Sequence, residues 1–153
     1  MAPDFLGTDQ DFFNLLTSSF ARLVGRPLVE PPQDAEWLYN EAPFVVLAHN
    51  TEPDPRFVYA NRAAQRCFGY DWNEFVLLPS RLSADMQDRQ ERQRLLDAVA
   101  RDGFIANYRG LRVTRSGHHF WMQDGIVWQL VDEKGHHHGQ AATFSRWTEQ
   151  VVA

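Results

Sequence analysis

The chain has 153 residues, 44% of them hydrophobic, and its 20 Asp and Glu outnumber its 15 Lys and Arg to give a net charge of -5. This length and apolar content are typical of one globular domain with a single core. The acidic balance argues against a protein that grips nucleic acid phosphates, and no window approaches the ~18 apolar residues that span a bilayer. The N-terminus lacks the basic and apolar regions of a secretory signal, and the only cysteine, Cys67, excludes an internal disulfide. We therefore expect a soluble cytoplasmic protein.

The first part of the chain has helical periodicity. Apolar residues recur at helical spacing from Asp9 to Val24, and Gly25 with the prolines after it is predicted to end that helix. A second, short helix is predicted from Ala35 to Glu41. We divide the chain into an N-terminal helix and Pro-rich connector, residues 1–34, and a main domain, residues 35–153. The first helix is expected to act as a cap or a dimer contact.

A strand hairpin and three further helices are predicted next. Phe44 to Ala48 and Phe57 to Ala60 are short apolar runs that flank a Pro-containing turn, which favours two strands. Asn61 is predicted to cap a helix that Gly69 ends. Asp71 is predicted to cap a short helix, and Ser83 the longest one, which runs to Asp102.

From Gly103 onward the period changes to two, which predicts three strands joined by turns at 115–117 and 132–139. In the first strand, Gly110 is predicted to form a bulge that bends the sheet. Five bulky residues of the second strand are predicted to face one way: Phe120, Met122, Ile126, Trp128 and Leu130. The third strand is predicted from Gln140 to Trp147. With the hairpin these strands make an α+β fold, a five-stranded antiparallel sheet whose helices cover one face and leave room for a cavity.

This order of elements resembles the PAS fold. A set of strings resembles, more specifically, the MEKHLA domain, a PAS-related module found alone in bacteria and at the C-terminus of plant homeodomain-leucine zipper regulators. The strings are YANRAA (59–64), LPSRLSA (78–84), RQER (89–92), GFIANYRGLR (103–112), VW (127–128) and GQAATFSRW (139–147). They span roughly residues 37–147, although the hexapeptide that names the module does not occur. The resemblance implies a sensory or regulatory module, and it implies no ligand and no mechanism.

Asp124 is the first candidate site residue. Its parity places it with Met122 on the face predicted to point inward, where a carboxylate must be paired or protonated and could contact a ligand. Alternatively, Gly125 marks a bulge that turns Asp124 outward. The second alternative is slightly preferred.

The other candidates for the pocket come from the predicted strands and helices. His49 ends the first strand, where its imidazole could bind a polar ligand group or a metal, or could simply make a hydrogen bond in a turn. The remaining candidates are Tyr59, Asn61, Trp72, Phe75, Tyr108, Met122 and Trp128. Asn61 is equally suited to capping a helix, and the aromatic residues to an ordinary core.

Two cofactors common among PAS relatives are disfavoured. Cys67 does not lie in anything similar to the Asn-Cys-Arg-Phe string of flavin-binding light sensors, so flavin photochemistry is not expected. Haem-binding PAS sensors commonly use a histidine from the long helix before the last strands, and residues 83–102 contain none. The histidines at 136–138 lie in a Gly-bounded turn, where we expect adventitious metal binding at most.

The sequence therefore predicts a PAS-like module that binds an unidentified small molecule, a protein partner or both, and that acts as a homodimer or through a signalling partner. We expect neither nucleic-acid nor membrane binding, and no catalysis. One alternative is a small isomerase or lyase that uses His49 or Asp124 as base and Tyr59 or Tyr108 as hydrogen-bond donor. The other is a purely structural dimerisation domain without a pocket.

Overall fold

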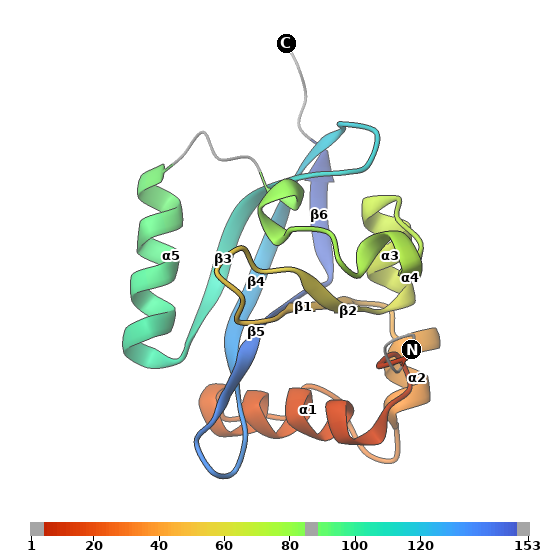
Figure 1. Ribbon diagram of the computed structural model, residues 1–153, viewed down its shortest axis with the longest axis vertical. Coiled ribbons are helices and arrows are strands. Elements are labelled where there is room, and N and C mark those ends of the chain that lie inside the picture. Colours follow the sequence, from red (N-terminus) through yellow and green to blue (C-terminus); the bar gives the residue numbers. More distant parts are fainter. Residues whose placement is uncertain (1–4, 85–88, 150–153) are drawn as a thin grey trace.

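An antiparallel sheet with helices on both faces forms the body of the protein, as the computed structural model in Figure 1 shows. The structure describes residues 5–84 and 89–149. Its sheet has the strand order β2-β1-β5-β4-β3, and a short β6 pairs with the first part of β4. The strands are β1 (Val45–His49), β2 (Phe57–Ala60), β3 (Phe104–Val113), β4 (His119–Val131), β5 (His137–Phe144) and β6 (Arg146–Glu149). The predicted α+β fold is confirmed, and the predicted last strand is divided between β5 and β6.

Six helical segments accompany the sheet: α1 (Gln10–Val24), α2 (Ala35–Asn40), α3 (Arg62–Phe68), α4 (Trp72–Phe75), the 3-10 helix η1 (Ser80–Ser83) and α5 (Arg89–Asp102). The predicted caps Asn61 and Asp71 are confirmed, because each side chain accepts a backbone N–H in the first turn of the helix that follows. Asp9 caps α1 in the same way. Gly25 and Gly69 end α1 and α3 in the left-handed conformation. No helix in the described ranges has the length and apolar character needed to cross a bilayer.

Ser83 does not begin α5, so its predicted role as an N-cap is wrong. Its hydroxyl instead donates to the carbonyl of Ser80 at 2.8 Å, within η1. Ala84 is then extended and forms an isolated bridge with Arg112 of β3, which is incompatible with a helix starting at Ser83. The predicted first turn of the long helix falls on residues 85–88, outside the described residues.

The side-chain alternation of three neighbouring strands is interrupted along one line across the sheet. In β3 the extra residue is Asn107, with φ 55°, and in β4 it is Asp124, with φ 51°. The two extra residues offset one another, so β3 and β4 have the same register on both sides of them. Ile105 pairs with Val127 on one side, and Gly110 pairs with Met122 on the other. Ser145 separates β5 from β6 at the same level. We call Asn107, Asp124 and Ser145 the crease.

The crease corrects the predicted orientation of β4. Phe120 and Met122 lie on one face of the sheet, whereas Ile126, Trp128 and Leu130 lie on the other. The prediction that all five share a face was wrong because the extra residue at Asp124 shifts the alternation by one position. The switch in β3 likewise falls at Asn107 and not at Gly110, although a register shift does precede Gly110.

Each face of the sheet carries its own core. Residues of α3, α4 and α5 pack on the first face, which we call the cavity face, around Phe68 and Phe75. Helix α1 packs on β4 across the other face, the α1 face, where Leu16 and Phe20 meet Trp128. The predicted extra N-terminal helix is therefore part of the folded body (Figure 1).

A polar contact fixes α1 to the end of β4. The hydroxyl of Ser19, which is 1% exposed, donates to the carbonyl of Val131 at 2.9 Å and accepts the N–H of the same residue at 3.0 Å. The guanidinium of Arg22 donates to that carbonyl as well. The position of α1 thus depends on specific hydrogen bonds in addition to apolar contact.

Asn61 joins three elements through its buried side-chain amide. The amide nitrogen donates to the carbonyls of Leu38 at 3.1 Å and Phe44 at 3.0 Å. The amide oxygen accepts the N–H of Val46 at 3.1 Å and that of Ala64 at 3.0 Å. One side chain therefore supplies hydrogen-bond partners to backbone groups at the end of α2, at the start of β1 and in the first turn of α3.

Replacing Asn61 by alanine is expected to lower the free energy of unfolding by about 3 kcal/mol or more. Several buried backbone groups lose their partner, and each unsatisfied buried group costs about 1–3 kcal/mol. Urea denaturation followed by circular dichroism measures the change. Asn73→Ala, at an exposed position of α4, is the matched control and should stay within about 0.5 kcal/mol of the wild type. Equal losses in the two variants would contradict the role of Asn61.

Candidate ligand-binding cavity

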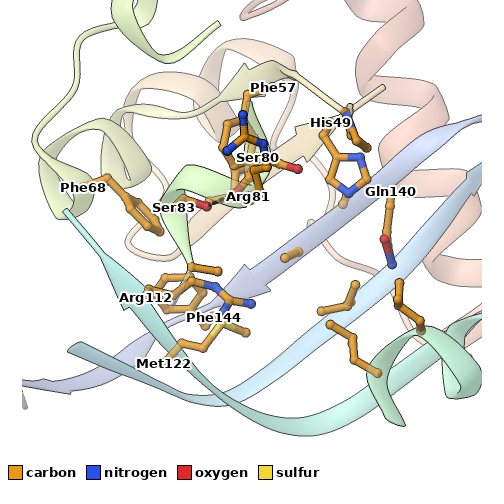
Figure 2. A pocket seen from close by; sticks show the side chains of 18 residues that line it. His49, Phe57, Phe68, Ser80, Arg81, Ser83, Arg112, Met122, Gln140 and Phe144 are labelled. Atoms are coloured by element: carbon orange, nitrogen blue, oxygen red, sulfur yellow. Dashed lines mark hydrogen bonds between the residues drawn. The ribbon is translucent and has the colours of Figure 1, made fainter. Parts of the chain in front are cut away.

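A cavity of about 170 Å³ lies between the cavity face of the sheet and the segment formed by η1 and α5. Figure 2 shows the side chains that line it, which come from β1, β2, α3, η1, α5 and β3 to β5. Its polar lining residues are His49, Ser80, Arg81, Ser83, Arg112 and Gln140, and its larger apolar ones include Leu47, Phe57, Phe68, Met122, Val127 and Phe144. The site therefore combines an apolar body with a few polar groups, as ligand pockets commonly do.

The floor of the cavity consists of rows of cross-strand neighbours. His49 of β1 pairs with Gln140 of β5, which in turn pairs with Gln129 of β4, so an imidazole and two amides form a polar row. Two positions along, Leu47 pairs with Ala142 and Ala142 with Val127, which makes an apolar row. Alanine has the smallest side chain of this row, so the floor is recessed at Ala142.

One wall of the cavity carries two arginines. Arg81 on η1 forms an ion pair with Asp54 at 3.2 Å, and both side chains are about half exposed. Arg112 on β3 is partly buried and donates to the carbonyl of Leu111 at 3.0 Å. The bridge between Ala84 and Arg112 ties the end of η1 to β3, so both arginines border the same cavity.

His49 is partly buried at the end of β1. Its Nδ1 lies 2.9 Å from the carbonyl oxygen of Asn50, and its ring lines the cavity. Figure 2 places its imidazole and the Gln140 amide at one end of the cavity. The structure thus combines the two predicted interpretations, a hydrogen-bonded turn histidine and a residue that faces the pocket.

The structure does not gather the nine predicted pocket residues into one site. His49 and Met122 line the cavity. Phe75 and Tyr108 are buried in the core of the cavity face without lining it, and Asn61 is engaged in the network described above. Tyr59, Trp72 and Trp128 belong to the core of the α1 face. The side-chain alternation of β2 turns Tyr59 to that face, and the crease in β4 turns Trp128 to it. Their binding to a ligand stays a prediction that this geometry does not favour.

Tyr59 and Trp128 are nevertheless unusual members of that core. Both are almost completely buried, and within the described part of the chain neither the Tyr59 hydroxyl nor the Trp128 Nε1 has a hydrogen-bond partner. Burial, helped by the nearby Tyr39, raises the pKa of the Tyr59 hydroxyl far above its usual value. The phenol is therefore neutral throughout the physiological pH range.

Asp124 does not face inward, as its parity along β4 would place it, but outward, as the slightly preferred alternative predicted. Its side chain is 63% exposed and forms an ion pair with Arg146 at 3.5 Å. The left-handed backbone at this extra residue turns the carboxylate outward, the alternative predicted from Gly125. Of the base and donor residues of the predicted isomerase or lyase, Asp124, Tyr59 and Tyr108 are therefore not among the residues that line the cavity with His49.

Sequence reasoning missed most of the polar groups of the cavity. Arg81, Ser83, Arg112 and Gln140 were not predicted to line it, and neither was Ala142 in its floor. A signal for them existed, because all five lie within the family-like strings 78–84, 103–112 and 139–147. Arg112 follows the crease residue Asn107 on β3, so the alternation before the crease does not give its orientation, and Arg81 and Ser83 lie on η1, where strand alternation does not apply.

Cys67 and the histidine turn lie away from the cavity. Cys67 borders a separate, open depression beside the β3–β4 turn, and burial raises the pKa of its thiol to about 12. In the other turn, His138 Nε2 lies 2.8 Å from Asp132 Oδ2, a contact that lowers the pKa of the Asp132 carboxyl. Within residues 5–84 and 89–149, no three His, Cys, Asp or Glu side chains are grouped to hold a metal ion.

The architecture is that of PAS and LOV domains. The PAS domain of a protein from Colwellia psychrerythraea matches with a TM-score of 0.62 at 13% identity, over 71% of this chain and 89% of that one. The light-state dimer of the fungal blue-light photoreceptor Vivid matches with a TM-score of 0.59 at 15% identity, over 82% of this chain and 90% of that one. The LOV domain of the blue-light activated histidine kinase of Erythrobacter litoralis EL346 matches with a TM-score of 0.55 at 19% identity, over 71% of this chain and 97% of that one. These likenesses show that the fold is PAS-like.

Within that class the chain belongs to the MEKHLA domain family, which it matches over residues 10–149. The match confirms the resemblance drawn from the strings. It begins at the start of α1, so the family's domain includes this helix, whereas the predicted division of the chain at residue 34 stays a prediction. No curated protein matches the chain.

The burial of Cys67 predicts slow alkylation of the folded protein. At pH 8 the rise of the thiol pKa from 9 to about 12 lowers the thiolate fraction about a thousandfold, and the thiolate is the nucleophile. The rate of reaction with iodoacetamide, compared with that in denaturing urea, measures the effect. Stability should also fall as pH rises from 9 towards 12, where the unfolded chain loses this proton first. Equal rates in the folded and unfolded protein would contradict this account.

Proposed function

We propose that this chain is a sensory module whose cavity binds a small molecule. The cavity itself carries the proposal, since polar groups lie at its end and along its wall while its middle is apolar. Its volume of about 170 Å³ is below the roughly 300–1,000 Å³ of drug-sized ligand pockets. This supports a small metabolite over a cofactor as large as a flavin or a haem.

The same strands supply a route from the cavity to α1. Ala142 faces the cavity, while its neighbour Ala141 belongs to the core beneath α1. Val127 and Trp128 alternate in the same way on β4. A ligand that moves the strands at the cavity therefore changes the packing of α1, which passes the signal to a second copy or to another signalling protein.

We also propose a binding role and no catalysis. General acid–base chemistry needs a base and a donor within hydrogen-bond reach of one substrate. Of the predicted base and donor residues, only His49 lines the cavity. The polar lining is suited to recognising a ligand by hydrogen bonds and charge.

Filling the floor of the cavity should abolish ligand binding without unfolding the protein. In Ala142→Leu the added side chain projects from the apolar row into the existing space, so the destabilisation should stay below the about 1–3 kcal/mol of an overpacked core. A thermal-shift screen of small metabolites, followed by titration calorimetry of each hit, measures the effect. Compounds that raise the melting temperature of the wild type should bind the variant at least tenfold more weakly.

Ala100→Leu is the matched control, because it adds the same bulk at an exposed position of α5. It should bind every hit as the wild type does. Native mass spectrometry of gently purified wild type and Ala142→Leu adds a direct reading of any retained molecule. If all hits bind Ala142→Leu as tightly as the wild type, or if no metabolite binds the wild type, the proposed function is overturned.

A further inference from the structure

We propose that the ligand of this cavity is a neutral molecule with one aromatic ring, whose carboxamide group pairs with the side-chain amide of Gln140. The inference rests on the proposed function and names the chemical class of the ligand. Three features of the cavity support it. The floor has a recess for a flat ring, aromatic and thioether side chains line one end, and the Gln140 amide lies at the other.

The cavity has the size and shape for one six-membered ring. Its volume is about 170 Å³, and an apolar cavity of about 150 Å³ is large enough to hold benzene. The place for the ring is the recess at Ala142, between Leu47 and Val127. Those two neighbours lie on the strands to either side, and at about 4.8 Å between strands their backbones are roughly 10 Å apart. A flat ring with a small substituent therefore fits the floor.

Aromatic and thioether side chains line the end of the cavity away from Gln140. Figure 2 shows Phe68, Phe144 and Met122 at that end. The centres of the Phe68 and Phe144 rings lie 6.5 Å apart, with an angle of 74° between the ring planes, and Met122 is fully buried. Aromatic rings pack edge to face with further rings and make favourable contacts with methionine sulfur. These side chains therefore favour an aromatic ring over a saturated ring of the same size.

Gln140 determines which polar group the ligand carries. It precedes Ala142 by two residues on β5, so the two side chains share a face and lie about 7 Å apart along the strand. Its neighbour His49 already contacts the carbonyl oxygen of Asn50. The amide of Gln140 is partly buried and has no side-chain hydrogen bond within residues 5–84 and 89–149. A carboxamide offers one donor and one acceptor, so it satisfies this amide with two hydrogen bonds.

The charged side chains of the lining already have partners, which favours a neutral ligand. Arg81 forms an ion pair with Asp54 at 3.2 Å. Arg112 donates to the carbonyl of Leu111 and has a further interaction, so its guanidinium is not free. None of the described residues that line the cavity is an Asp or a Glu that could pair with a cation. An ion that enters this cavity leaves water without gaining a free opposite charge, which costs more than the transfer of a carboxamide.

Four probes of matched size test the inference on the full chain by titration calorimetry: phenylacetamide, phenylacetate, methyl phenylacetate and cyclohexylacetamide. Phenylacetamide is expected to bind at least tenfold more tightly than phenylacetate, which is charged, and than the methyl ester, which has no N–H donor. It should also bind at least threefold more tightly than cyclohexylacetamide, which lacks the aromatic ring. Its affinity should fall at least tenfold in Gln140→Met. Gln123→Met is the matched control and should bind as the wild type does, since Gln123 lies on β4 outside the cavity and bonds Thr148 at 3.0 Å.

The outcomes separate the ligand class from the proposed function. If any of the other three probes binds as tightly as phenylacetamide, and Ala142→Leu abolishes that binding, the cavity is a ligand site and the aromatic carboxamide inference is overturned. If no probe binds the wild type, the inference is overturned, while the metabolite screen still decides the proposed function. Phenylacetamide binding that Ala142→Leu or Gln140→Met leaves unchanged also overturns it. Should Gln140→Met fail to fold, Gln140→Glu keeps the shape of the side chain, removes its N–H donors and should weaken phenylacetamide binding at least tenfold.

Discussion

The interrupted alternation along the crease is the constraint on which the rest of the structure depends. A strand without an extra residue would place Met122 and Trp128 on the same face, because side chains repeat every two residues. With Asp124 in the left-handed region, Met122 faces the cavity and Trp128 packs against Phe20. The matching irregularity at Asn107 restores the pairing of β3 with β4 on either side. Met122 and Val127, on the two sides of the crease, can therefore both line the cavity, while Trp128 supports α1.

This arrangement gives the sheet two different tasks on its two faces. Polar anchors hold the elements around it: the Asn61 amide joins α2, β1 and α3, and the Ser19 hydroxyl fixes α1 to β4. Between them, the strands that form the cavity floor are the strands on which α1 rests. The proposed sensory role depends on this sharing, because the strands of the cavity floor lie directly beneath α1.

Most of the fold could be predicted from the sequence because its local signals are strong. Caps such as Asn61 and Asp71 and the glycine that ends α3 act within a few residues of their own position. The crease depends on pairing between distant strands: Gly125 indicated the bulge at Asp124, whereas the bulge of β3 was expected at Gly110 and lies at Asn107. The prediction of the cavity residues was the least accurate, because the residues of β4 were assigned to a face by an alternation that the crease interrupts. Ser83 shows the same limit, because its hydroxyl bonds back to Ser80 and Ala84 pairs with distant Arg112.

The cavity and the core beneath α1 both require that β4 change face at Asp124. A nuclear Overhauser spectrum of the labelled protein tests this directly, with Trp128 and Met122 as reporters on the two sides of the crease. The account predicts strong cross-peaks between the Trp128 indole and the Phe20 ring, whose centres lie 4.9 Å apart, and none from that indole to the methyl group of Met122. Cross-peaks that join Trp128 to Met122 or to Leu95 of α5 would place both halves of β4 on one face and contradict it.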